Sequence, residues 1–416
     1  MPFDRNAYPA AITMKHVRPV PALPSLIALG ALLACSVSAQ AETSPYYIGA
    51  SQSFTSDSNV RRAATGNESS DVISATGLRA GLDQPLGRQR LFANLSVDSN
   101  RYNKTSELNH TSYAVGAGLD WETVERLSGK LSLDSRQSLY RDTSQVLVRR
   151  SLVRSDTAGF EARLGTVTLW SFDAGLSAGR VRYSDDIYRA SNLSQHTFSA
   201  GARYQPSPDW NVRLGVRRTD GKYPDATVQD DFSRNDFDVT TRLQLSGASV
   251  VDARLSRTSE KHSIATKTDV NGFTGSLGWT WQASGKSSLG VVLSRDSSVG
   301  SYDTTAVASA SDANTTLTNS LAVRGTWQAT AKIRLNATLG YAQRTLDGNL
   351  IATGARITDA KDSFRRAGLS LDYALLRNVD LGCALNWEER SVQEQITQTY
   401  AYNAKTFGCF GQIYLR

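Results

Sequence analysis

Apolar and polar residues alternate most regularly in the stretch from Leu321 to Tyr341. The apolar positions of its two arms are Leu321, Val323, Gly325 and Trp327, then Ile333, Leu335, Ala337, Leu339 and Tyr341. A period of two is typical of β-strands with one apolar face. Arg324 and Arg334 lie on the other face, which indicates that this face meets water. The pattern therefore predicts a hairpin between an apolar medium and water.

Segments of the same kind follow one another along the chain. The first strand is predicted over 46–54 and, after a polar loop over 55–70, the second over 71–82. Short turns are expected at 83–87, 127–130, near Thr168, at 207–209, 246–248 and 284–286, near Thr330, and at 377–378. They recur roughly every 40 residues, the length of two membrane-spanning strands with their turn and loop. We expect about eighteen strands.

The predicted fold class is all-β, a transmembrane antiparallel up-and-down β-barrel. An even number of strands places both chain ends on one side, and short turns are typical of the periplasmic side. Tryptophans next to the short turns fit an aromatic girdle there: Trp121, Trp170, Trp210, Trp279, Trp281 and Trp327. A large soluble all-β protein is the alternative, but no segment carries the continuous apolar run of a sandwich core. The expected location is the outer membrane of a Gram-negative bacterium, with both termini periplasmic.

The N-terminus has the pattern of a secretory signal peptide. Lys15 and Arg18 precede a short apolar run over 25–36, and Ala39-Gln40-Ala41 fits a cleavage site. We therefore assign 1–41 to the signal peptide and 42–416 to the barrel, with Met14 as a better start than Met1. A competing interpretation makes Leu32-Leu33-Ala34-Cys35 a lipobox with Cys35 as a lipid anchor.

Composition supports a β-rich membrane protein. The 416 residues are 40% hydrophobic with a mean hydropathy of −0.34, and beyond the signal no apolar run is long enough for a membrane helix. The formal net charge of +7 alone says little. A barrel of this size encloses more space than its side chains fill, so an aqueous lumen is expected. Loops over 296–314 and 347–362 could fold inward and constrict it.

The alternation assigns ten arginines to the lumen face. They are Arg136, Arg163, Arg203, Arg213, Arg217, Arg242, Arg254, Arg324, Arg334 and Arg366. Acidic residues share this face, among them Asp238, Asp252 and Asp372. Two interpretations stay open: a salt-bridge lattice that stiffens the wall, or a basic lining that lowers the barrier for an anionic solute.

The sequence offers no convincing catalytic, cofactor or metal site. Gly175-Leu176-Ser177-Ala178-Gly179 matches the nucleophile-elbow pattern, but it alternates down one predicted strand instead of turning into a helix. The histidines after the signal stand apart in different loops. Cys383 and Cys409 lie in the last two predicted strands, nearly opposite each other. Either a disulfide or two unpaired thiols fits, and we favour the disulfide because the periplasm is oxidising.

Three segments resemble a known family. The runs Tyr47–Val60, Gly77–Arg90 and Gly118–Glu122 are similar to the EpsL-type outer-membrane proteins of exopolysaccharide biosynthesis, also described as beta-barrel porin 2 proteins. The resemblance implies a passive conduit that exports a secreted polysaccharide, anionic polymers included. The implied partners are outer-membrane lipid and periplasmic or inner-membrane export machinery, with no nucleic acid. The alternative is a general or anion-preferring diffusion porin for small solutes, and an enzyme or adhesin is a third class without supporting residues.

Overall fold

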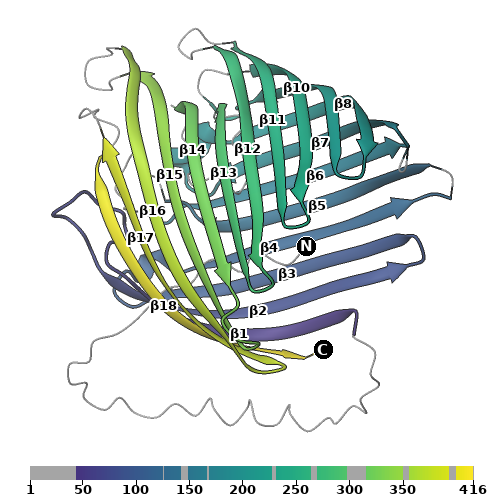
Figure 1. The fold of residues 1–416 in the computed structure, drawn as a ribbon. Helices are drawn as coiled ribbons and strands as arrows, with labels where there is room; N and C mark the ends of the chain where they lie inside the picture. Colours follow the sequence, from purple (N-terminus) through teal and green to yellow (C-terminus); the bar gives the residue numbers. More distant parts are fainter. Residues whose placement is uncertain are drawn as a thin grey trace.

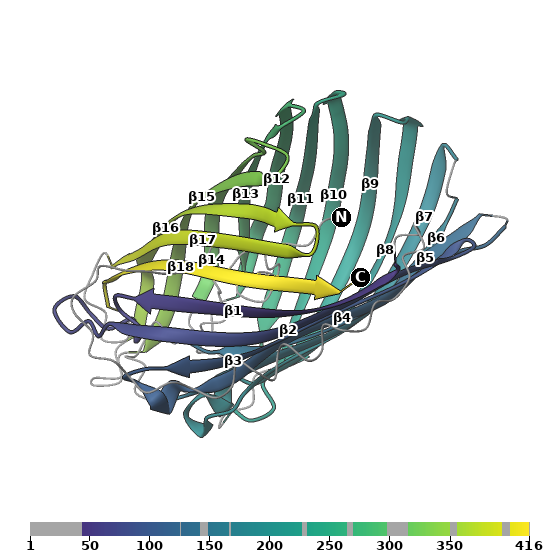
Figure 2. The same cartoon turned by 90° about the horizontal axis from the view of Figure 1, so that it is seen from below.

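The computed structural model describes residues 44–124, 126–141, 149–165, 168–226, 231–263, 269–297, 315–349, 356–392 and 400–415. They form one 18-stranded antiparallel sheet in which each strand pairs with the next in the chain. The first strand also pairs with the last, from Ile48 opposite Leu415 to Asp57 opposite Thr406, so the sheet closes on itself (Figures 1 and 2). The predicted barrel is confirmed.

The strands are long and uninterrupted. Their bounds are β1 Tyr46–Asp57, β2 Asp71–Leu86, β3 Gln89–Tyr102, β4 His110–Glu122, β5 Leu127–Leu139, β6 Leu152–Leu164, β7 Trp170–Tyr183, β8 Leu193–Ser207, β9 Trp210–Lys222, β10 Asp231–Ser246, β11 Ser249–His262, β12 Val270–Ser284, β13 Ser287–Ser297, β14 Thr315–Trp327, β15 Ile333–Asn349, β16 Arg356–Leu376, β17 Val379–Val392 and β18 Tyr402–Leu415. Two short 3-10 helices, η2 (Ser106–Leu108) and η3 (Asp186–Ser191), lie between strands. Within the described ranges, no helix has the length and apolar character to cross a membrane.

One face of the wall carries large apolar side chains that have no protein to pack against. Phe160 is 43% exposed and its register partner Leu176 is 59% exposed. The same parity places the six tryptophans near short turns on this outer face, where Trp170 and Trp327 are about half exposed. A closed barrel with a continuous apolar exterior is the arrangement that satisfies every backbone group inside a bilayer. The protein is an outer-membrane β-barrel.

The connections separate by length onto the two ends of the barrel. Short ones of two to five residues lie at 87–88, 123–126, 165–169, 208–209, 247–248, 285–286, 328–332 and 377–378. The start of β1 and the end of β18 lie at this same end, because Tyr46 pairs with Leu82 and Ile48 with Leu415. We call it the short-turn end, and the opposite one the long-connection end.

One of the predicted turns was wrong. The turn expected at 127–130 lies within β5, and the chain reverses at 123–126 instead. Leu127 is one of the outward-facing apolar residues of β5. Its backbone N–H donates to the Thr123 hydroxyl, and this hydrogen bond closes the turn before the strand begins.

At the long-connection end, the β1–β2 connection folds into the barrel. Val60 and Ala63 are 0% and 2% exposed, and Val60 packs against Leu108 of η2. The Asn59 amide donates to the backbone oxygens of Ala63 and, across the barrel seam, Asn403. Of the two loops predicted to turn inward, 296–314 lies outside the described residues from 298 on. The other, 347–362, was predicted too long, because its first three residues belong to β15 and 356–362 belong to β16, and only 350–355 lie outside the described residues. A different loop therefore narrows the described lumen.

Candidate functional site: the inner wall and its arginines

The register places all ten predicted arginines on the inner face. They alternate with the exposed apolar residues of their strands, as Arg324 does between Val323 and Gly325 opposite Thr338 of β15. The concave side is identified by contacts that span several strands. Arg234 of β10, for example, reaches Thr274 of β12 and Ser297 at the end of β13. The ten differ in exposure and in partners, which decides what each can do.

Three inward arginines are exposed and have no ion-pair partner among the described residues: Arg136 on β5, Arg334 on β15 and Arg366 on β16. An exposed side chain on the concave face must be in contact with water, because protein encloses it on every other side. The interior beside β5, β15 and β16 is therefore hydrated. A cation there keeps its field available to a passing solute.

A half-buried cluster lies on β6 to β9 toward the short-turn end. Arg213 on β9 donates from Nε to both carboxylate oxygens of Asp173 on β7, at 2.9 Å each. To reach β7, its guanidinium lies across Gly201 of β8, where a Cβ atom would come within 2.5 Å of the guanidinium carbon. Glycine at this position leaves the space for the arginine to cross. The missing side chain at Gly201 of β8 therefore lets the Arg213 guanidinium lie over this strand.

Arg163 and Arg203 complete this cluster without acidic partners of their own in the described part of the chain. Arg203 is the register partner of Arg213, and Arg163 is that of Asp173. The Nε atoms of Arg163 and Arg203 are buried and make no hydrogen bond to the described residues. Together with Lys130 and Glu161 these side chains line a hollow of about 490 Å³. Arg88, Asp120 and Glu122 also line this hollow, so its five basic side chains exceed its four carboxylates by one, and the surplus comes from the three arginines around Asp173.

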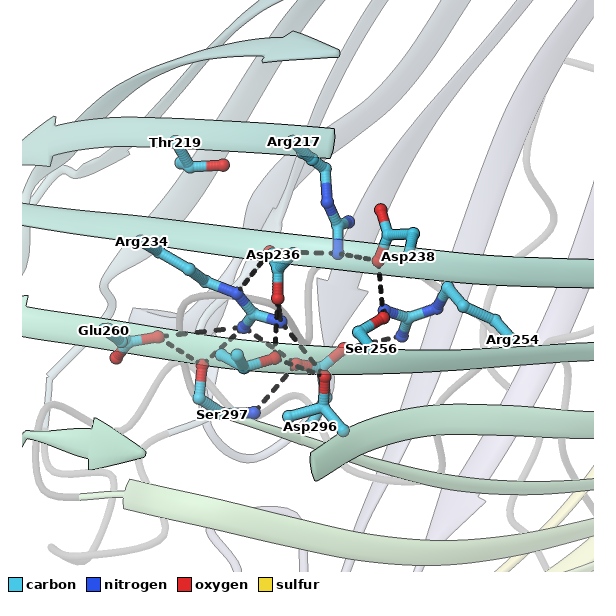
Figure 3. Close-up of polar contacts among 12 residues, drawn as sticks. Arg217, Thr219, Arg234, Asp236, Asp238, Arg254, Ser256, Glu260, Asp296 and Ser297 are labelled. Atoms are coloured by element: carbon cyan, nitrogen blue, oxygen red, sulfur yellow. Dashed lines mark hydrogen bonds and ion pairs between the residues drawn. The ribbon is translucent and has the colours of Figure 1, made fainter. Parts of the chain in front are cut away.

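A second cluster, on β9 to β13 near the long-connection end, is a charge lattice (Figure 3). Arg234, 2% exposed, is paired with Asp236 at 2.8 Å and with Asp296 at 2.8 Å. Asp296 also accepts from Arg254 at 2.9 Å, and Asp236 contacts Arg217 at 3.1 Å. Every carboxylate here touches at least one guanidinium, as buried charges require. For Arg217 and Arg254 the structural interpretation applies.

A third cluster lies on β15 to β17. Asp362 accepts from Arg344 Nε at 2.9 Å and from Arg390 Nε at 2.8 Å, and all three side chains are almost fully buried. Both guanidinium carbons lie over the Phe364 ring, 4.7 and 5.2 Å from its centroid. Two cations thus share one carboxylate and one aromatic face, which adds cation–π attraction to the ion pairs.

The inward loop is held by a charged residue. Arg62 has the left-handed backbone conformation, with φ 52°, that non-glycine residues rarely adopt. Its guanidinium is paired with Asp57 at 2.8 Å and with Glu388 of β17. Burial lowers the pKa of Arg62, but Glu388 and Asp57 together outweigh burial and raise it above the ordinary value. Arg62 therefore stays charged and fastens the β1–β2 connection to β1 and β17.

The most buried arginines were not predicted: Arg62, Arg234, Arg344 and Arg390. Extending the alternation of β10 upstream from Asp238 would have placed Asp236 and Arg234 on the inner face. Extending β15 past Tyr341 would have found Arg344 in the same way. Arg62 lies in a loop and has no periodic signal. Among the ten predicted arginines, Arg217 and Arg254 belong to a salt-bridge lattice, whereas the exposed Arg136, Arg334 and Arg366 do not.

The cysteines and the elbow pattern can now be placed. Cys383 and Cys409 are register partners on the outer face, with Cα atoms 4.0 Å apart and their sulfurs joined as a disulfide. Ser177 lies in the middle of β7, and Gly175 and Gly179 lie on the same inner face on either side of it. The strand continues through this segment, so the strand-to-helix turn of a nucleophile elbow is absent there. In the described part of the chain, no group of three His, Cys, Asp or Glu residues could hold a metal ion.

Comparison with known proteins gives similarity of fold. No family of known proteins matches the chain, and no curated protein sequence does. Among solved structures, the outer membrane protein opdK from Pseudomonas aeruginosa is 13% identical, with a TM-score of 0.47 over 89% of this chain and 99% of that one. OccAB3 from Acinetobacter baumannii is 10% identical, with a TM-score of 0.46 over 89% and 99% of the two chains. Identities this low concern the fold alone.

Proposed function

We propose that the protein is a passive outer-membrane channel that prefers small anionic solutes. The observation that carries the proposal is the set of exposed inward arginines without ion-pair partners in the described residues, Arg136, Arg334 and Arg366. A fixed cation in a hydrated lumen attracts anions and raises the barrier for cations. Arg334 and Arg366 lie on the neighbouring strands β15 and β16, and Arg136 lies on β5, far from them in the barrel order, so unpaired cations face the lumen from two parts of the wall.

The cluster of Arg163, Arg203 and Arg213 supports the same function. Its positive surplus lies on β6 to β9, toward the short-turn end. A solute that enters from the long-connection end would pass the lattice of Figure 3 and then meet this basic wall. We place the short-turn end in the periplasm, since short turns are typical of that side. We expect solutes to diffuse through the channel into the periplasm, down their concentration gradient and without an energy source.

Export of an exopolysaccharide is the second candidate, and its support is the resemblance of the segments named above. The buried β1–β2 connection favours small solutes over a polymer. Val60 and Ala63 occupy space inside the barrel that a polysaccharide chain would need. For this reason we rank the small-solute channel first.

The test is ion selectivity in planar bilayers. We expect the parent to prefer chloride over potassium, and the variant Arg136→Gln, Arg334→Gln, Arg366→Gln to shift its reversal potential toward cation preference. Glutamine keeps a polar side chain in water, so the barrel should stay folded. The control is Arg242→Gln with Asp252→Asn, which removes an exposed inner ion pair of 3.0 Å without changing net charge.

The outcomes separate the candidates. If the triple variant keeps the selectivity of the parent while the control does too, the exposed arginines do not set ion preference and the proposal fails. A large, non-selective conductance in the parent, together with loss of secreted polysaccharide in a deletion strain, would favour export instead.

A further inference from the structure

The outer face of the barrel carries a basic patch at the long-connection end of β6, β7 and β9. It consists of Arg154, Arg180, Arg182 and Lys222, all exposed. Their outward direction follows from the register: Asp156 faces Arg180, Ala158 faces Ala178, and Phe160 faces Leu176 in the same alternation. These cations thus stand on the lipid side of the wall, where the lumen cannot use them.

Three of the four cations in this patch have no ion-pair partner among the described residues. Arg154 and Arg182 lie directly opposite each other on neighbouring strands, a placement of like charges that costs stability unless an anion intervenes. Asp156 accepts from Arg154 at 2.9 Å and from the Ser135 hydroxyl at 2.6 Å. Arg180, Arg182 and Lys222 form no ion pair with any described residue. The patch therefore has three cations in excess.

A hollow beside these cations could hold the missing anion. It has a volume of about 530 Å³, and Arg180, Arg182 and Lys222 line it together with two carboxylates that have partners of their own. Asp186 is paired with Arg189 at 3.5 Å, and Asp225 accepts from the Asn192 amide at 2.7 Å. Ser194 of β8 lies between them, as the register partner of both Arg180 and Lys222. Arg189 of η3, in the connection between β7 and β8, also lines the hollow. Guanidinium, ammonium and hydroxyl donors thus converge on one space, which is the donor set that phosphate oxygens prefer.

The position of the patch identifies the source of the anion. Leu176 and Phe198, both about half exposed, lie on the same outer face closer to the barrel middle. Arg180 is four residues beyond Leu176, or roughly 13 Å along the strand at about 3.3 Å per residue. Cations at that distance above an apolar belt lie at the level of lipid headgroups.

We infer that this patch binds a phosphorylated glycolipid headgroup in the outer leaflet, with the phosphate in the hollow and the acyl chains on the belt. The inference rests on the orientation proposed above, in which the long-connection end faces outward. The site is separate from the lumen, so it anchors the protein among anionic lipids without affecting solute passage.

The test is binding of purified, detergent-folded protein to a diphosphorylated glucosamine glycolipid, read by native mass spectrometry. The variant is Arg180→Gln, Arg182→Gln, Lys222→Gln. Each cation near an anionic lipid contributes about a factor of five, so we expect roughly hundredfold weaker binding. The matched control, Arg257→Gln, Lys261→Gln, Arg295→Gln, removes three outward cations from β11 and β13, where Arg257 lies over Phe273 and Arg295 donates to Asn319. Its binding should stay within a few-fold of the parent.

Three results would overturn the inference. Equal binding by the patch variant and the parent excludes the site, provided that heat-modifiable mobility shows both are folded. If the control variant loses as much glycolipid binding as the patch variant, the binding depends on outward positive charge in general. If inorganic phosphate competes as strongly as the glycolipid does, and the dephosphorylated lipid binds as well as the phosphorylated one, the hollow binds a soluble anion and not the lipid headgroup. Because this assay measures neither transport nor orientation, its failure is distinct from failure of the proposed channel function.

Discussion

At the scale of single residues, the inner wall distinguishes two kinds of charge. The Asp362 carboxylate is enclosed by Arg344 and Arg390 over Phe364, and none of the three charged groups reaches water. Arg242 and Asp252, paired at 3.0 Å, are instead exposed by 60% and 52%. Breaking a buried pair leaves an uncompensated charge, whereas an exposed pair contributes little.

The first stability prediction follows from this contrast. Asp362→Asn keeps the shape of the side chain but leaves two buried guanidiniums without their shared carboxylate. We expect a loss of about 3–5 kcal/mol in the free energy of unfolding. Urea unfolding in lipid vesicles, followed by tryptophan fluorescence, measures it. Arg242→Gln serves as control and should change the same quantity by less than about 1 kcal/mol. Similar small losses in both variants would contradict the prediction.

At the scale of elements, strand existence could be predicted because the alternation is local. In the hairpin of β14 and β15, Leu321 pairs with Tyr341 and Val323 with Leu339, as the pattern indicates. The ends of the strands were predicted less accurately. Leu127-Ser128-Gly129-Lys130 has the composition of a turn, yet Leu127 and Gly129 continue β5 as partners of Leu164 and Ala162. Composition alone does not reveal which of two adjacent polar stretches reverses the chain.

The inward loop could not be predicted for a different physical reason. Its contacts join residues that are far apart in the sequence: Asn59 with Asn403, and Arg62 with Glu388. A period along the chain carries no information on such contacts. The same holds for the site, where alternation indicated that Arg213 faces inward but not that it crosses Gly201 to reach Asp173. Partners set the role of each arginine, and partners follow from register.

The second prediction concerns this loop. Deleting residues 61–68 removes the buried Ala63 and the Arg62 anchor from the barrel interior, so we expect a higher single-channel conductance. Arg62→Gly is the matched variant: it keeps the loop and relieves the left-handed backbone, but it loses the ion pairs to Asp57 and Glu388. Its current should fluctuate more while its mean conductance stays closer to the parent. An unchanged conductance after the deletion would mean that another segment sets the narrowest point.

At the scale of the whole molecule, the distribution of charged side chains differs between the two ends of the barrel and between its inner and outer faces. Inside, carboxylates match guanidiniums in the lattice near the long-connection end, as with Arg234 and Asp296. Unmatched arginines occur nearer the short-turn end, as Arg163 and Arg203 do, and also toward the long-connection end of β5, as Arg136 does. Outside, unmatched cations occur at the rim of the long-connection end. Of the two proposals, the glycolipid site depends on which end of the barrel faces the medium.

The last prediction decides that orientation. Single cysteines at Ala190 in η3, which is exposed, and at Gly247 in the β10–β11 turn, where an added Cβ meets no atom within 4 Å, mark the two ends of the barrel. In intact cells, a membrane-impermeant maleimide should label Ala190→Cys at once and Gly247→Cys only after the outer membrane is permeabilised. The parent is the control and should stay unlabelled, because Cys383 and Cys409 are joined and Cys35 lies in the segment expected to be removed as the signal peptide. Label on the parent would show free thiols and refute the disulfide.

The reverse order of labelling would place the short turns outside and the basic patch in the inner leaflet, where the glycolipid site would lose its physical basis. The anion preference would survive that result, since inward arginines act on a solute from either direction.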